Sequence, residues 1–351
     1  MSRSGSCAVG LLALAALAGC QENNVAPAQA PQSQPYYPQP APHYGPPAPY
    51  PQGPAPVPAQ TPVLAPPPAQ APVPAAAPAQ GTRPVLGPLV GPLAWQAEVR
   101  AVESELVSRL SAQNRARVVN VPLVFDPNPN QVNAFAGCDD GGAPFVAATE
   151  GLLEAVDAIA QTRATDELFS TQTYVAYVGA VAPRLVSQEG GSAALPAGIL
   201  PPQALFDVRR ISRSHEMFDE IVAFTFGHEL AHHYLGHTGC ANGQAAGFGP
   251  ALEQLGRIVT NLGNVFNQPN EIAADSAGCI NVLDTGLTRA SVAYRWRETG
   301  GLVLLDFFAA LERASGANPF LGFLRTHPNP GLRIPIVQGV AATWRLQHPG
   351  T

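Results

Sequence analysis

Two histidines and a glutamate with helical spacing stand within residues 227–237, which read GHELAHHYLGH. On a helix, His228 and His232 lie about one turn apart on the same face, so their ring nitrogens can converge on one ion, with Glu229 beside it. Zinc fits these donors best, because it accepts imidazole and carboxylate ligands in tetrahedral geometry and keeps a position open for water when it catalyses. The motif therefore predicts one Zn²⁺ per chain.

A catalytic zinc site needs a third protein ligand, and a candidate stands in NQPNEIAADSAGCINVL at residues 267–283. The asparagine and proline at its start suit a helix N-terminus, and Glu271 and Asp275 then lie one turn apart. We expect Glu271 to be the third ligand and Asp275 to orient one of the ligand histidines. Taken alone, the two carboxylates could equally form a solvated acidic face; the upstream histidines favour the metal interpretation.

Several further elements must position these residues. The helix with the histidines is predicted over 215–236, because its apolar residues occupy nearly every face, as in a helix through the middle of a domain. Hydrophobic periodicity and turn residues predict the other elements. These are helices over 95–114, 173–185 and 267–283, a strand over 118–126, and an extended segment, a glycine turn, a strand and a helix over 133–160. Residues 165–214 as a whole suggest no role.

The N-terminus has the pattern of a removed targeting segment. A short cationic start and the apolar run CAVGLLALAALA predict a signal peptide over residues 1–19, too short to span a bilayer as a stable helix. LAGC at 17–20 resembles the bacterial lipobox, in which Cys20 becomes the lipid-modified N-terminus and anchors the protein to a membrane. Gln21, not aspartate, follows, which by resemblance to sorted lipoproteins favours the outer over the inner membrane. An ordinary signal peptide with a chance cysteine is the alternative.

A proline-rich stretch follows the signal. Residues 24–92 hold 23 of the 38 prolines, with alanine and glutamine between them. Such a composition cannot bury a core and predicts a disordered, polyproline-II-rich tether. Its tyrosines could instead form a docking motif for a partner or the cell wall. The chain thus divides into a signal (1–19), a lipidated cysteine with a linker (20–92) and one domain (93–351).

Charge adds little about partners. The formal net charge is −6, and only 13% of residues are charged. No basic surface is indicated, so we expect no nucleic-acid partner.

The combined motifs resemble the M48 family of zinc metallopeptidases. HELAH at 228–232, NEIAAD at 270–275, VNAFA at 132–136 and THPNPGLRI at 326–334 carry the resemblance, which spans about residues 117–334. It implies an α+β, mostly helical gluzincin fold with a small β-sheet. The interval from Leu153 to His228 is longer than is usual in that family, and we expect the extra chain to form a lobe or lid near the cleft.

The ligands and the resemblance together imply metal-assisted peptide hydrolysis. Glu229 is the expected general base, which takes a proton from water that the zinc activates and delivers it to the departing amine. His327 and Arg333 are candidate donors to the oxyanion, with Tyr234 behind them. His327 could instead be a fourth zinc ligand in a resting state, or only cap a turn before Pro328. We expect His233 and His237 to support the site or the fold.

VNAFA resembles the family's edge strand beside the active site. An unpaired strand edge can accept a substrate peptide as an added strand, which would favour unfolded or extended polypeptides. An ordinary edge strand is an equal alternative.

The cysteines remaining after removal of the signal and lipidation of Cys20 are Cys138, Cys240 and Cys279. In an oxidising compartment this odd number predicts one disulfide and one free thiol. We expect Cys240 to pair with Cys279 and pin the two metal helices together, with Cys138 to Cys240 as the competing pair. Cys138 could also reach the zinc and silence it until oxidised.

The sequence therefore predicts a lipid-anchored zinc endopeptidase on the periplasmic side of the outer membrane, acting on misfolded or misassembled envelope proteins. A zinc-binding chaperone or assembly factor is the first alternative, and it requires that function survive a change of Glu229. A cell-wall-associated structural lipoprotein is the second, and it requires that the proline tract alone retain partner binding.

Overall fold

The computed structural model describes residues 85–187, 191–243, 247, 249–255, 267–289, 295–316 and 326–350. The signal peptide, Cys20 and the tether up to residue 84 lie outside these ranges. The described part is mostly helical with one small sheet, as the α+β prediction requires. The chain already contacts the helical layer before the expected domain start at Leu93, since Leu86 N donates to Ser212 Oγ over 2.9 Å.

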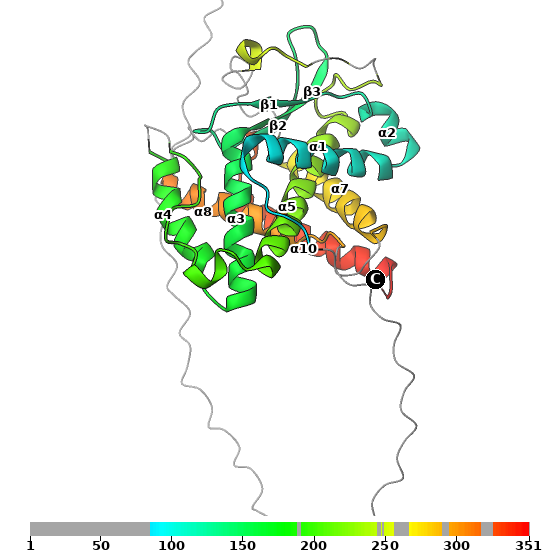
Figure 1. Ribbon diagram of the computed structural model, residues 1–351. Coiled ribbons are helices and arrows are strands. Elements are labelled where there is room, and N and C mark those ends of the chain that lie inside the picture. The colour runs from blue at the N-terminus through cyan, green and yellow to red at the C-terminus, as the bar shows by residue number, and fades with distance from the viewer. Residues whose placement is uncertain are drawn as a thin grey trace, which may run out of the picture. The chain divides into compact units, whose positions relative to one another are not determined.

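The central element is helix α5 (Val208–Tyr234), around which the other helices pack (Figure 1). Its N-cap Asp207 accepts hydrogen bonds from the backbone N–H groups of Arg209 and Arg210, which satisfies two otherwise unpaired donors. Nearly every residue from Arg210 onward is buried, as the apolar residues on all faces of this segment predict. Neighbours on several sides therefore fix its position.

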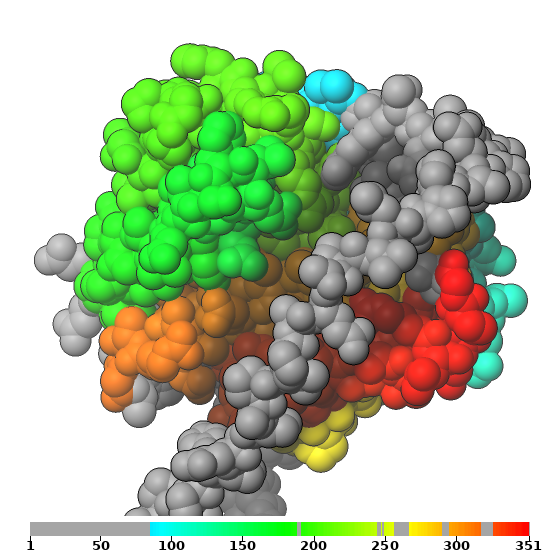
Figure 2. All heavy atoms as spheres, turned by 90° about the horizontal axis from the view of Figure 1, so that it is seen from below, coloured from blue at the N-terminus to red at the C-terminus, as the bar shows by residue number. Residues whose placement is uncertain are grey.

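The helices that contact α5 directly surround it. They are α1 (Gly91–Arg109), α2 (Ala112–Val118), α3 (Glu150–Phe169), α7 (Gln268–Leu287) and α8 (Thr299–Ser315), while α4 (Thr173–Leu185) packs on α3 and α8, and α10 (Pro330–Gln347) packs on α7 and α8. Figure 2 shows α8 in orange next to α10 in red on one face. A single 3₁₀ turn, η1 (Pro202–Ala204), precedes α5. Helix α4 coincides with the helix predicted over 173–185.

The sheet has three strands in the order β1-β3-β2. Strand β1 (Leu123–Asp126) pairs in parallel with β3 (Pro144–Thr149), and β2 (Ala134–Cys138) pairs with β3 in antiparallel. The last three residues of the VNAFA segment thus lie in an edge strand, as both interpretations of the segment predicted. The C-terminal end of α5 contacts this sheet, since His233 Nε2 lies 2.9 Å from the carbonyl oxygen of Phe145.

Residues 165–214, for which no role was predicted, contribute the end of α3, then α4, η1 and the start of α5. Tyr177 of α4 stacks on Phe307 of α8 and donates its hydroxyl to the carbonyl oxygen of Ala193. These contacts place α4 in the helical layer. The extra chain was expected to form a lobe or lid near the cleft, and this stays a prediction. None of the described residues of this segment belongs to the ligand group described below.

Candidate metal centre

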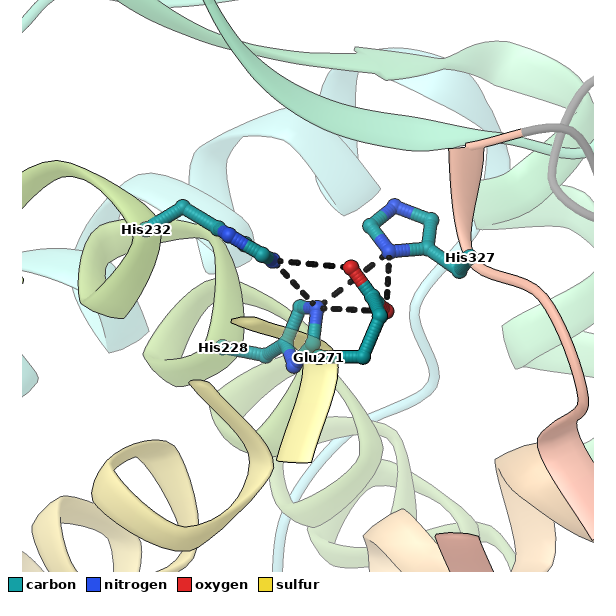
Figure 3. A group of neighbouring side chains, drawn as sticks. All are labelled: His228, His232, Glu271 and His327. Atoms are coloured by element: carbon teal, nitrogen blue, oxygen red, sulfur yellow. Dashed lines mark hydrogen bonds and ion pairs between the residues drawn. The ribbon is translucent and has the colours of Figure 1, made fainter. Parts of the chain in front are cut away.

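Four buried side chains converge beneath the edge strand (Figure 3). His228 and His232 come from α5, Glu271 from the first turn of α7 and His327 from the segment before α10, and one ligand atom of each lies within 4.8 Å of all the others. The Nε2 atoms of His228 and His232 are 3.0 Å apart, and Glu271 Oε1 lies 3.3 Å from His232 Nε2. The structure therefore brings together the three predicted ligands and His327, for which a role as fourth ligand was one of the predicted alternatives.

A close crossing of α5 and α7 sets this geometry. Gly278 of α7 lies against Gly227 and His228 of α5, and a Cβ at Gly278 would lie 2.7 Å from His228 N. The absence of both side chains at the crossing lets the two backbones approach, so Glu271 reaches the histidines from one end of α7. Asn267 caps that end by accepting from Asn270 N.

Asp275 and Arg333 lie on the Nδ1 side of the His228 ring. Asp275 Oδ1 lies 2.9 Å from His228 Nδ1, and Arg333 donates to both oxygens of Asp275 over 2.7 and 2.6 Å. Burial alone would raise the pKa of Asp275, but the Arg333 guanidinium outweighs it and lowers the pKa. Asp275 is thus an ionised acceptor that keeps the proton of His228 on Nδ1 and leaves Nε2 free to bind a cation.

Arg333 forms ion pairs with both carboxylates of this network. Its Nη1 lies 2.9 Å from Glu271 Oε2, and only 1% of the residue is exposed. Burial alone would raise the pKa of Glu271, but the charge of His327 and the contacts of the carboxylate with His232 and His327 lower it. Arg333 therefore faces the carboxylates behind the ligand group.

His327 connects the ligand group to the sheet. Its Nδ1 lies 2.9 Å from Glu271 Oε2, and its Nε2 lies 3.1 Å from the carbonyl oxygen of Ala134 in β2. Since a carbonyl oxygen only accepts, Nε2 carries a proton there. Burial would lower the pKa of His327, but the carboxylates of Glu271 and Glu229 outweigh it and raise the pKa.

The donor chemistry fits a metal ion. His228 Nε2 lies 3.6 Å from Glu271 Oε2, and His327 Nδ1, which carries a lone pair in the neutral ring, lies 2.9 Å from the same oxygen; all three residues are buried. Lone pairs and carboxylate oxygens repel one another unless a cation lies between them. The buried carboxyl groups of Glu271 and Asp275 also pair with the Arg333 guanidinium, and the buried carboxyl group of Glu229 lies next to His327. A divalent cation would balance this charge, so the cluster could hold a metal ion.

Glu229 lies at the edge of this group. Its Oε1 is 3.3 Å from His327 Nε2. Its Oε2 is buried and has no hydrogen-bond partner among the described residues. One carboxylate oxygen is therefore available to a small polar ligand such as water.

The remaining predicted residues take supporting positions. His237 Nδ1 lies 3.0 Å from His232 Nδ1, so a proton shared there leaves His232 Nε2 available to an ion. Burial lowers the pKa of His232 well below its ordinary value, which keeps the ring neutral. His233 links α5 to β3, and Tyr234 is buried in the hydrophobic core.

The expected disulfide between Cys240 and Cys279 is wrong. The structure joins Cys138 to Cys240, which was the competing pair, and leaves Cys279 as a buried thiol. Cys138 ends β2, which runs beside the segment that follows α5, whereas Cys279 points into the core. Burial raises the pKa of Cys279 to about 12. Cys138 is in the bridge and is not one of the metal-cluster residues.

Two features could not be read from the sequence. The Ala134 carbonyl oxygen contacts His327 through its backbone, which leaves no signal in residue type. Gly278 could have been singled out only by knowing that α5 and α7 cross at that residue.

Comparison of the chain with known protein families, with curated proteins and with solved structures finds no match. Within the described residues, no helix combines the length and apolar character needed to cross a membrane.

Proposed function

We propose that this chain is a zinc-dependent endopeptidase of the M48 type with a gluzincin fold. The observation that carries the proposal is the meeting of His228, His232 and Glu271 beside a buried Glu229 with an unpaired oxygen. Imidazole nitrogens and a carboxylate are the donors that zinc takes in hydrolytic enzymes. When bound, zinc supplies Lewis-acid polarisation of a carbonyl group and activation of water at neutral pH.

Glu229 is the general base in this proposal. Its unpaired Oε2 can accept a proton from an attacking water and pass it to the leaving amine. His228 and His232 hold the metal through Nε2, with Asp275 and His237 on their other ring nitrogens. Because Arg333 is bound to Asp275 and Glu271, we assign it to ligand support and not to the oxyanion.

His327 has two possible roles in the enzyme. In its present position Nδ1 belongs to the ligand group, which favours the role of a fourth ligand in a resting state. Rotation away from Glu271 would instead free its N–H groups for an oxyanion. Either role requires His327 to leave the present arrangement before a substrate carbonyl can approach.

The proposed substrates are unfolded or extended polypeptides. Strand β2 is an edge strand beside the ligands, and an extended peptide can add to such an edge through main-chain hydrogen bonds. The lipobox at Cys20 and the signal pattern support a location on the periplasmic side of the outer membrane, where misfolded envelope proteins are the proposed targets.

A zinc-binding chaperone or assembly factor is the second candidate. The observation that favours it is the fourth side chain, because four protein ligands are typical of structural zinc sites without a position for water. The two candidates differ in whether the Glu229 carboxylate is needed.

The test compares zinc content and casein cleavage of the full chain in detergent with those of Glu229→Gln. The surface change Glu253→Gln is the matched control. An endopeptidase requires about one zinc at this centre in all three proteins, with cleavage in the parent and the control and a loss of at least ~100-fold in Glu229→Gln. Zinc binding without cleavage by any of the three proteins, or by His327→Ala, would favour the chaperone. Equal cleavage by all three proteins would instead overturn the role of Glu229 as general base.

A further inference from the structure

A second group of potential ligands lies at the other end of α5. Glu98 of α1 and His215 and Asp219 of α5 place one ligand atom each within 4.8 Å of the other two. His215 Nε2 is 3.4 Å from Glu98 Oε2 and 3.9 Å from Asp219 Oδ1. Helical rise puts His215 roughly 20 Å along α5 from His228, so this group is separate from the candidate metal centre.

The ring of His215 is oriented by the backbone. Its Nδ1 lies 2.8 Å from the carbonyl oxygen of Gly87, which can only accept, so Nδ1 carries the proton. In the neutral ring, Nε2 then presents its lone pair to the two carboxyl groups. A backbone carbonyl on the second ring nitrogen is the usual support of a metal-binding histidine.

Asp219 supplies an independent observation that points to a cation. The residue is only 4% exposed, and its Oδ1 is buried with no hydrogen-bond partner among the described residues. The nearby Arg289 donates two hydrogen bonds to Glu105, over 3.1 and 2.8 Å. This buried carboxylate oxygen faces the His215 imidazole, and no arginine of the described residues forms an ion pair with it.

We propose that Glu98, His215 and Asp219 form a second metal site for a divalent transition-metal ion such as Zn²⁺. Ligands about 2.0–2.1 Å from a tetrahedral zinc ion lie about 3.3 Å apart. The separation of His215 Nε2 from Glu98 Oε2 is 3.4 Å, close to that value, and the separation from Asp219 Oδ1 is longer, at 3.9 Å. The side chains of Glu98 and His215 are 28% and 14% exposed, so the ion can enter from solvent and a water can complete its coordination.

The site has a structural role. It joins α1 to α5, and through Gly87 it includes the chain just before α1. An ion there would fasten the start of the folded region, which lies within the last residues of the predicted tether, to the central helix.

The experiment measures zinc stoichiometry and affinity of the full chain after chelation and reloading with Zn²⁺, by elemental analysis and calorimetry. Glu98→Gln and His215→Asn are the test variants, and His348→Gln, which changes a histidine outside both clusters, is the control. Circular dichroism checks that each variant is folded. We expect each test variant to bind one zinc fewer than the parent, or that zinc at least ~100-fold more weakly, with no change in the control.

The outcome is independent of the proposed peptidase. If the candidate metal centre holds no zinc, the parent still binds one ion and Glu98→Gln loses it; if both sites bind, the count falls from two to one. Folded test variants that keep the parent's stoichiometry and affinity would overturn the proposal and leave the cluster as an ion pair of protonated His215 with its two carboxylates.

Discussion

The carboxylate of Asp275 determines which ring nitrogen of His228 can bind a metal. Asp275 lies 2.9 Å from His228 Nδ1 and is itself fixed by two hydrogen bonds from Arg333. In Asp275→Asn, a neutral amide no longer favours the proton on Nδ1, and Arg333 loses its charged partner. We expect zinc affinity to fall about 10- to 100-fold, measured by competition with a chromophoric chelator.

The control for this change is Asp306→Asn on α8, which removes an acceptor of Tyr174 outside the ligand group. Its zinc affinity should equal that of the parent. An unchanged affinity in Asp275→Asn would mean that the proton on Nδ1 does not govern metal binding, and would remove Asp275 from the site.

At the scale of elements, the crossing of α5 and α7 is the feature that makes the site. A Cβ at Gly278 would lie 2.7 Å from His228 N, a backbone atom that cannot move aside without shifting α5. We expect Gly278→Ala to lower the free energy of unfolding by about 1–3 kcal/mol, as overpacking typically does, and to weaken zinc binding. Urea unfolding and zinc competition measure the two effects.

Gly339→Ala on α10 is the matched control, because nothing lies within 4 Å of its added Cβ. There the change should leave stability unchanged or raise it by up to ~1 kcal/mol, since alanine favours a helix over glycine. Equal effects at the two positions would show that the close crossing does not limit stability.

Helix α5 also contains a buried carboxyl group outside the ligand cluster. Burial raises the pKa of Glu220 from 4.5 to about 7, although Arg213 and Arg297 oppose it, and its Oε2 has no hydrogen-bond partner among the described residues. Between pH 4.5 and 7 the unfolded chain therefore releases a proton that the folded chain keeps. The folded state loses stability as pH rises through this interval, and the loss is constant above it.

Glu220→Gln removes this titration. We expect the variant and the parent to have similar stability near pH 4.5, and the variant to gain about 1–3 kcal/mol relative to the parent by pH 8. Urea unfolding at several pH values measures the difference, with Glu312→Gln on α8 as a control. A difference that does not grow with pH would mean that Glu220 is not the group that titrates.

The elements could be predicted from sequence where their signals are local. The helices at 173–185 and 267–283 have apolar periodicity or capping residues in the sequence, and the structure places α4 and α7 there. The i, i+4 spacing likewise sufficed to bring His228 and His232 together. The positions of His327 and Arg333 depend on how α10 packs on α7, and no local sequence pattern indicates that packing. The role of His327 was therefore left open, and Arg333 was assigned to the oxyanion.

At the scale of the whole molecule, the candidate metal centre unites segments that are far apart in the chain. The sheet, α5, α7 and the start of α10 each contribute, and β2 is tied both to His327 by its backbone and to the end of α5 by the disulfide. The sequence favoured a bridge between the two metal helices because Cys240 and Cys279 follow their motifs closely. Nearness in sequence to a motif does not indicate which face of a helix a cysteine occupies.

The disulfide makes the stability of the whole domain sensitive to redox conditions. Cys138 and Cys240 are 102 positions apart, and the loop that they close contains β3, α3, α4 and α5. In the chain-entropy account, a cross-link over ~100 residues stabilises by about 3–5 kcal/mol, because it restricts the unfolded chain. We expect Cys138→Ala/Cys240→Ala to lose about this much in urea unfolding without reductant, and reductant to bring the parent to the same level. Cys279→Ala should remain sensitive to reductant, because it keeps the bridge. A parent that reductant does not affect, together with a double variant of equal stability, would exclude the Cys138–Cys240 pairing as a stabilising bridge.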